Sequence, residues 1–170
     1  MSRKESVIRD ELNIKGDGFY CFFPFERLDK YNKGIFKVGY TTNTISNRAE
    51  NYHTYFPLGV YVVATLENLY SKGIVRNGYS KDMFYRSVED QLFSILERNG
   101  AEIINSSTRI MRDGKSEWFY TNVKTIHNAF SEIERQYGGN MKLYHLRGIF
   151  RNADERQKRK YYNAEIYYPL

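Results

Sequence analysis

The chain has 170 residues, of which 41% are hydrophobic and 27% charged, with a net charge of +6. This balance excludes an intrinsically disordered chain and allows one domain with a buried core. Its only cysteine, Cys21, excludes an internal disulfide, and we expect this thiol to be a buried strand residue. The longest apolar stretch, near residues 55–66, is shorter than the ~20 residues of a membrane helix, so we expect no membrane contact. The charged first residues predict no signal peptide, and an intracellular protein, cytoplasmic or nuclear.

The first two predicted strands follow an N-terminal arm, which we place at residues 1–17. Residues 18–23 alternate two sets of apolar and aromatic side chains, which predicts a strand with Tyr20 on the face opposite to Cys21. Residues 34–40 predict a second strand, joined to the first by a long loop in an antiparallel hairpin.

A helix is predicted directly after the second strand, with Asn43 or Thr44 as its N-cap. Its apolar stripe contains Ile45 and Ala49, and Arg48 falls on the same stripe. A guanidinium group in such a place requires a buried partner or a phosphate. Arg48 is therefore a candidate functional residue.

The remaining elements continue the alternation of strands and helices. A β-branched run at 60–66 predicts a third, centrally placed strand, and a helix is expected at about 82–98. Short strands are expected at 103–110 and 116–121, and the spacing of apolar residues predicts an amphipathic helix at 124–137. In the helix at 82–98, Glu89 falls beside the apolar face, as Arg48 does in the earlier helix.

We predict a domain at residues 18–137, a boundary at Gly138–Gly139 and a basic C-terminal extension at 138–170. Residues 142–170 hold seven basic and three acidic residues, so four of the six net positive charges lie there. This excess indicates a polyanionic partner, although a solvated helix face explains it equally well. The candidate nucleic-acid-binding residues are Lys142, Arg147, Arg151, Arg156, Lys158, Arg159 and Lys160.

Three polar residues on the apolar faces of consecutive elements form the candidate site: Tyr20, Arg48 and Glu89. A lone carboxylate can hold one Mg²⁺ ion that keeps most of its water ligands. An arginine can stabilise charge on phosphoryl oxygens, and a tyrosine can accept or relay a proton. The combination indicates phosphodiester chemistry.

These residues resemble the motifs of the GIY-YIG nuclease superfamily. Residues 18–20, Gly-Phe-Tyr, are similar to its first motif, and residues 37–39, Lys-Val-Gly, to its second. Arg48 matches the helix arginine of the family, and Glu89 its metal-binding glutamate. The run Glu-Trp-Phe at 117–119 is similar to the branch found in phages and large DNA viruses.

The resemblance implies an α+β fold with a small three-stranded antiparallel sheet flanked by helices. It implies a DNA endonuclease that depends on Mg²⁺ or Mn²⁺, with Tyr20 as general base or proton relay. Either Lys37, which takes the place of a family tyrosine, or Tyr40 would support the phosphate, and His53 is a further catalytic candidate. The late asparagine of the family has Asn105 as its candidate here.

Each assignment has a structural alternative. Tyr20 could be an ordinary strand tyrosine, because strands favour aromatic residues, and Arg48 could form a structural ion pair with Glu89. His53 could be a histidine without a catalytic role, and Glu117 could be a surface hairpin residue beside a core tryptophan. The whole chain could be a catalytically silent relative, for example a component of a virus particle that binds proteins through its C-terminal extension, or a nucleic-acid-binding module.

Overall fold

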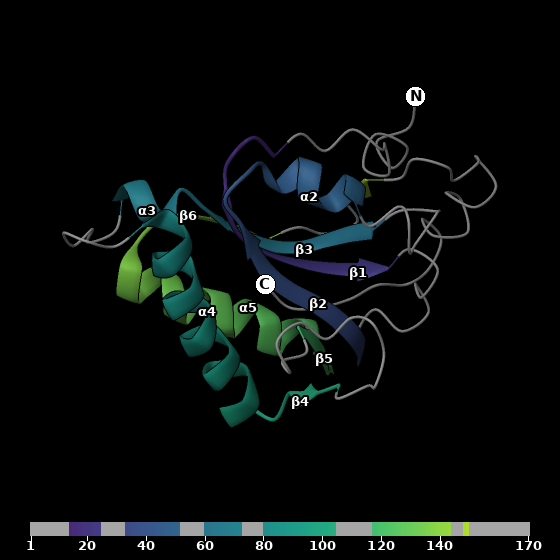
Figure 1. Cartoon of the computed structure of the whole chain (residues 1–170). Coiled ribbons are helices and arrows are strands. Elements are labelled where there is room, and N and C mark those ends of the chain that lie inside the picture. Colours follow the sequence, from purple (N-terminus) through teal and green to yellow (C-terminus); the bar gives the residue numbers. More distant parts are fainter. Residues whose placement is uncertain are drawn as a thin grey trace.

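A computed structural model gives the fold (Figure 1) and describes residues 14–24, 33–51, 60–72, 80–104, 117–143 and 148–149. The elements in these ranges are β1 Gly18–Pro24, β2 Lys33–Thr41, α2 Ile45–Asn51, β3 Val60–Glu67, α3 Leu69–Lys72, α4 Lys81–Arg98, β4 Glu102–Ile103, β5 Trp118–Asn122, α5 Val123–Tyr137, β6 Asn140–Leu143 and β7 Gly148–Ile149. The α+β class and the predicted α4 and α5 helices are confirmed.

The strands form one antiparallel sheet in the order β4-β5-β2-β1-β3-β6, and β7 also pairs with β3. The expectation of three strands was therefore wrong, because the described residues place seven strands in this sheet. The three predicted strands are its centre, β2-β1-β3. The strands added at the edges are two to five residues long, too short for a clear period of two in the sequence.

Helices cover both faces of the sheet. The larger core lies under α4 and α5, where the strand residues Phe19, Phe36 and Val38 pack against helix residues such as Phe130. The smaller core lies under α2, above β1 and β3 in Figure 1, and includes Tyr20. Cys21 is fully buried as predicted, and burial raises the pKa of its thiol.

The two long helices begin at side-chain caps that the sequence supplies. Ser80 accepts a hydrogen bond from the backbone N–H of Met83 at 3.1 Å, and Asn122 accepts one from that of Thr125 at 2.8 Å. Helix α4 ends at Asn99, and Gly100 follows with a φ of +93°, as predicted for this pair.

Both predicted domain boundaries fall inside packed structure. Ile14, in the predicted arm, is buried in the core under α2, and Asp17 accepts the hydroxyl hydrogen of Tyr85 on α4 at 3.2 Å. Strand β6 begins just after the predicted boundary at Gly138–Gly139 and pairs with β3. The predicted strand at 103–110 overlaps β4, Glu102–Ile103, and its residues 105–110 lie outside the described part of the chain. Within the described ranges, no helix is long and apolar enough to cross a membrane.

Candidate active site

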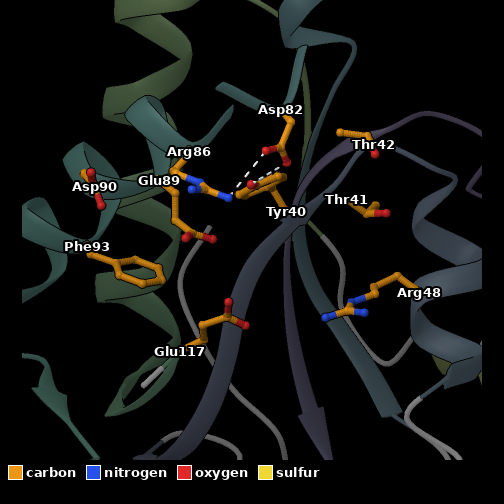
Figure 2. Close-up of a pocket in the computed structure, with 10 residues that line it drawn as sticks. All are labelled: Tyr40, Thr41, Thr42, Arg48, Asp82, Arg86, Glu89, Asp90, Phe93 and Glu117. Carbon is orange, nitrogen blue, oxygen red and sulfur yellow. Dashed lines mark hydrogen bonds and ion pairs between the residues drawn. The ribbon is translucent and has the colours of Figure 1, made fainter. Parts of the chain in front are cut away.

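A cavity of about 450 Å³ opens beside the C-terminal half of β2 (Figure 2). Six of the residues that line it carry the chemistry discussed below: Tyr40, Arg48, Asp82, Arg86, Glu89 and Glu117. They come from β2, from α2, from α4 and from the residue just before β5. Segments distant in the sequence therefore meet in one polar cavity.

The position of the cavity follows from the end of a strand ladder. The pairing of β2 with β5 ends at Lys37–Trp118, whereas β2 continues to Thr41. At this point the backbone carbonyl of Glu117 accepts a hydrogen bond from the N–H of Val38 at 2.9 Å. Because α2 and α4 lie on opposite faces of the sheet, side chains from both faces can reach this end of β2.

Arg48 enters the cavity from α2, whose N-cap is Thr44, with a hydrogen bond from Asn47 N–H to the Thr44 hydroxyl at 3.2 Å. The Nε atom of Arg48 donates to the Tyr20 hydroxyl at 3.1 Å. Figure 2 shows the nitrogen end of Arg48 pointing into the cavity. The arginine predicted on an apolar stripe is thus anchored at Nε and presents its guanidinium group to the cavity.

Tyr20 does not line the cavity. Its side chain is fully buried on the α2 face of the sheet, where its ring stacks on Phe22 with centroids 4.3 Å apart. Its hydroxyl lies close to Gly39, the residue opposite it on β2. A Cβ atom at position 39 would lie 2.8 Å from this hydroxyl, so a glycine is needed there. The structure therefore brings the Tyr20 hydroxyl to Arg48, but Tyr20 is not one of the residues that line the cavity.

Lys37, whose side chain is on the α2 face of β2, forms an ion pair with Glu117. The lysine side chain is 5% exposed and the glutamate side chain 24% exposed, so the carboxylate is the partner that reaches the cavity. Glu117 is partly exposed and directly precedes β5, which pairs with β4, and Trp118 beside it is buried as expected. The ammonium group of Lys37 compensates the charge of the carboxylate at the inner end of the cavity.

Tyr40 lies at the other side of the cavity, under the first turns of α4. Its hydroxyl donates to Asp82 Oδ1 at 2.8 Å, and Asp82 Oδ2 lies 3.5 Å from Arg86 Nη2. Burial raises the pKa of the Tyr40 hydroxyl, and the hydrogen bond to Asp82 and the nearby charge of Glu89 raise it further. Tyr40 therefore keeps its proton at neutral pH and acts there as a hydrogen-bond donor.

Glu89 reaches the cavity from α4, between the buried residues Val88 and Leu92. Its carboxylate and that of Glu117 point into the same space in Figure 2. In the part of the chain that the structure describes, no three His, Cys, Asp or Glu side chains are grouped to hold a metal ion together. Glu89 still fits Mg²⁺, which commonly takes one or two protein carboxylates and completes its shell with water and phosphate oxygens.

Of the remaining predicted site residues, Lys142 is the one that the structure describes, and it is not brought to this cavity. Lys142 lies on β6, separated from β2 by β1 and β3, with its Nζ atom 3.9 Å from Glu67 Oε2. His53 and Asn105 lie outside the described residues, as do the other predicted nucleic-acid-binding residues: Arg147, Arg151, Arg156, Lys158, Arg159 and Lys160.

Sequence reasoning missed Asp82 and Arg86 as cavity residues. They precede Glu89 by seven and three residues and lie on the same side of α4, so the helical spacing carried the signal. The role of Glu117 was also missed, because its nearness to Lys37 depends on the pairing of β2 with β5.

Comparison with known proteins agrees with the nuclease-like arrangement. The family model described as the T5orf172 domain matches residues 18–134, which is more than half of the chain. This is a nuclease-type domain found in phage proteins. No curated protein and no solved structure shows a significant match to the chain.

Proposed function

We propose that this protein, which belongs to the T5orf172 domain family, is a divalent-metal-dependent DNA endonuclease of GIY-YIG type. The observation that carries the proposal is the meeting of Arg48 and Glu89 in one cavity, from helices on opposite faces of the sheet. A cation and a carboxylate in one polar cavity suit the cleavage of a phosphodiester bond.

Glu89 would hold Mg²⁺ or Mn²⁺ in this proposal. The ion, when bound, would neutralise charge on the phosphate oxygens and lower the pKa of a bound water molecule. The carboxylate of Glu89 needs no further protein ligand for this, because phosphate and water oxygens complete the coordination of Mg²⁺.

Arg48 would bind the scissile phosphate through the nitrogen atoms that face the cavity. Its Nε bond to Tyr20 restricts the side chain, so that less conformational entropy is lost when the phosphate binds. Tyr40, whose hydroxyl hydrogen is donated to Asp82, would line the phosphate site, and the positive charge of Lys37 would stabilise the bound anion. The role of His53 stays a prediction from the family resemblance.

DNA is the proposed partner, in agreement with the nucleic-acid-related family. The cavity is lined by more acidic than basic side chains, so it offers little nonspecific attraction for a polyanion. We assign that attraction to the basic residues predicted in the sequence from Lys142 to Lys160.

The test is nicking of supercoiled plasmid by the full chain with Mg²⁺ or Mn²⁺. The Glu89→Gln variant keeps the side-chain volume and removes the charge, and we expect its cleavage rate to fall by at least about 10²-fold. Its melting temperature should be unchanged or higher, because a metal site is rarely optimised for the metal-free state.

The matched control is Glu97→Gln, the same change at an exposed position of the same helix. It should nick DNA at the wild-type rate. Equal nicking by wild type and Glu89→Gln would show that the site is misplaced. A wild type that is inactive with either metal, combined with a large drop in melting temperature for Glu89→Gln, would favour a structural or DNA-binding role.

A further inference from the structure

Two arginine side chains line the candidate active site, and they come from helices on opposite faces of the sheet. Arg48 belongs to α2 and is the proposed contact of the scissile phosphate. Arg86 belongs to α4, and Figure 2 shows its guanidinium group turned toward Tyr40. The endonuclease function as proposed gives Arg86 no task, although the planar guanidinium group matches the geometry of a phosphate.

Arg86 is held at the cavity by contacts that a ligand can replace. Its Nη2 atom lies 3.5 Å from Asp82 Oδ2, and the two side chains are 69% and 53% exposed. Exposed ion pairs between residues four positions apart on a helix contribute little to stability. Arg86 can therefore exchange the Asp82 carboxylate for a phosphate oxygen without a large loss of stability.

The same contacts orient the guanidinium group toward the cavity. Asp82 Oδ1 accepts the hydroxyl hydrogen of Tyr40 at 2.8 Å, while Oδ2 faces Arg86. Burial raises the pKa of the Tyr40 hydroxyl, and a hydrogen bond from Arg86 to that hydroxyl opposes this rise. The guanidinium group thus lies against two residues that themselves line the cavity, which reduces the number of conformations it must lose on binding.

Arg86 is also well placed relative to Glu89, the proposed metal ligand. Residues three positions apart on a helix lie on the same side, with Cβ atoms about 5–6 Å apart. This separation is comparable with that between neighbouring phosphate groups of a DNA strand. The cavity of about 450 Å³ is in the size range of sites that bind whole small molecules, so it is larger than one phosphate group requires.

The charges around the cavity leave room for a second phosphate contact. Glu117 is paired with Lys37, and the metal ion would compensate Glu89. Arg48 would be engaged by the scissile phosphate. Among the described residues that line the cavity, Arg86 is the remaining cationic side chain. A phosphate beside the scissile one would therefore find its cationic partner on α4.

We propose that Arg86 binds the DNA phosphate next to the scissile phosphate, and that Asp82 and Tyr40 position its guanidinium group for this contact. This inference rests on the proposed endonuclease function. The contact is made to the DNA backbone and to no base, so it orients the strand without reading its sequence. Arg86 is a binding residue and takes no part in proton transfer.

The test is binding of a fluorescently labelled DNA duplex by the full chain at a fixed Ca²⁺ concentration, over a series of KCl concentrations. Electrophoresis of the recovered duplex verifies that it is intact. Arg86→Gln should weaken binding about 10-fold at the lowest salt concentration. It should also reduce the slope of log Kd against log[KCl] by about 0.9, the value for one lost phosphate contact. Its melting temperature should stay at the wild-type value, because the side chain is exposed.

Arg98→Gln is the matched control. Arg98 is exposed on the same helix and is also paired with a carboxylate, Glu132 at 3.0 Å, but it does not line the cavity. This variant should bind DNA with the wild-type affinity and salt slope. The double variant Asp82→Asn/Arg86→Gln has the net charge of the wild type. It should keep the reduced slope of Arg86→Gln, because the phosphate contact is still absent.

Two results would overturn the inference. The first is an affinity and a slope for Arg86→Gln that equal those of Arg98→Gln. The second is recovery of both quantities in the double variant, which would show that Arg86 only neutralises Asp82. Plasmid nicking is measured separately. A wild type that never nicks, combined with the expected loss of binding in Arg86→Gln, would overturn the endonuclease function and leave Arg86 as a DNA-phosphate contact.

Discussion

The two faces of the sheet differ in what they bury. Under α4 and α5 the core is almost entirely hydrophobic, with aromatic rings in contact, such as Phe93 on Phe119 at 4.9 Å. Under α2 the core is smaller, and Lys37 and the hydroxyl of Tyr20 are buried in or beside it. The same three central strands supply side chains to both faces.

This difference indicates a division of tasks. Apolar burial stabilises a domain roughly in proportion to the area removed from water, so the α4–α5 face supplies most of the stability. The α2 face buries polar groups that need exact partners, and a buried polar network is stabilising only when every member is satisfied. The candidate site lies where this polar face reaches the end of β2.

The largest effect on stability is expected for Phe130→Ala, on the apolar face. The Phe130 side chain on α5 is fully buried, so its truncation leaves a cavity and should lower the free energy of unfolding by about 3–5 kcal/mol. Urea denaturation followed by circular dichroism measures this. Asn128→Ala, at an exposed position of the same helix, is the control and should unfold close to wild type. Equal midpoints would show that α5 does not stabilise the sheet.

Gly39→Ala tests the polar face and should have an intermediate effect. The added methyl group would lie 2.8 Å from the Tyr20 hydroxyl, and such overpacking typically costs about 1–3 kcal/mol. Displacement of Tyr20 would also release Arg48, so cleavage should fall more than stability suggests.

Combining Gly39→Ala with Tyr20→Phe removes the oxygen that the methyl group meets. The two changes should therefore be less destabilising together than the sum of each alone, as measured by a double-mutant cycle in urea. Simple additivity would mean that Gly39 and Tyr20 are not in contact.

The smallest effect concerns pH and returns to the α4–α5 face. Burial and the charge of Asp17 raise the pKa of Tyr85 above the ordinary tyrosine value of 10.0. Above that pH the folded state holds a proton that the unfolded chain has lost, so its contribution to stability is complete below pH 10 and declines as the pH rises. The decline is at most about 1.4 kcal/mol per pH unit for one group.

Melting temperatures from neutral to alkaline pH test this in wild type and Tyr85→Phe. The variant should be slightly less stable at neutral pH, because it loses the hydrogen bond to Asp17 at 3.2 Å. Its stability should then fall less steeply with pH than that of wild type. Parallel curves for the two proteins would contradict the shifted pKa.

Local sequence patterns predicted the central elements well. Strong periodicity predicted the first three strands and the helices α4 and α5, and the cap at Ser80 and the stop at Asn99–Gly100 agree with local residue chemistry. The short strand β6 was missed and the start of β4 was misplaced, since two to four residues carry little periodicity and their pairing partners are remote in sequence. Sheet size is therefore a tertiary property of this chain.

For the site, the sequence by itself determined which charges lie on apolar faces: Arg48 and Glu89 stand out because a helix repeats every 3.6 residues. Only the tertiary structure decided how they meet. Where the pairing of β2 with β5 ends, side chains from both faces of the sheet reach one cavity. The tertiary structure also places the buried Tyr20 hydroxyl against Arg48 and pairs Glu117 with Lys37. No local pattern contains this information, because strand register joins residues that are about 80 positions apart in the chain.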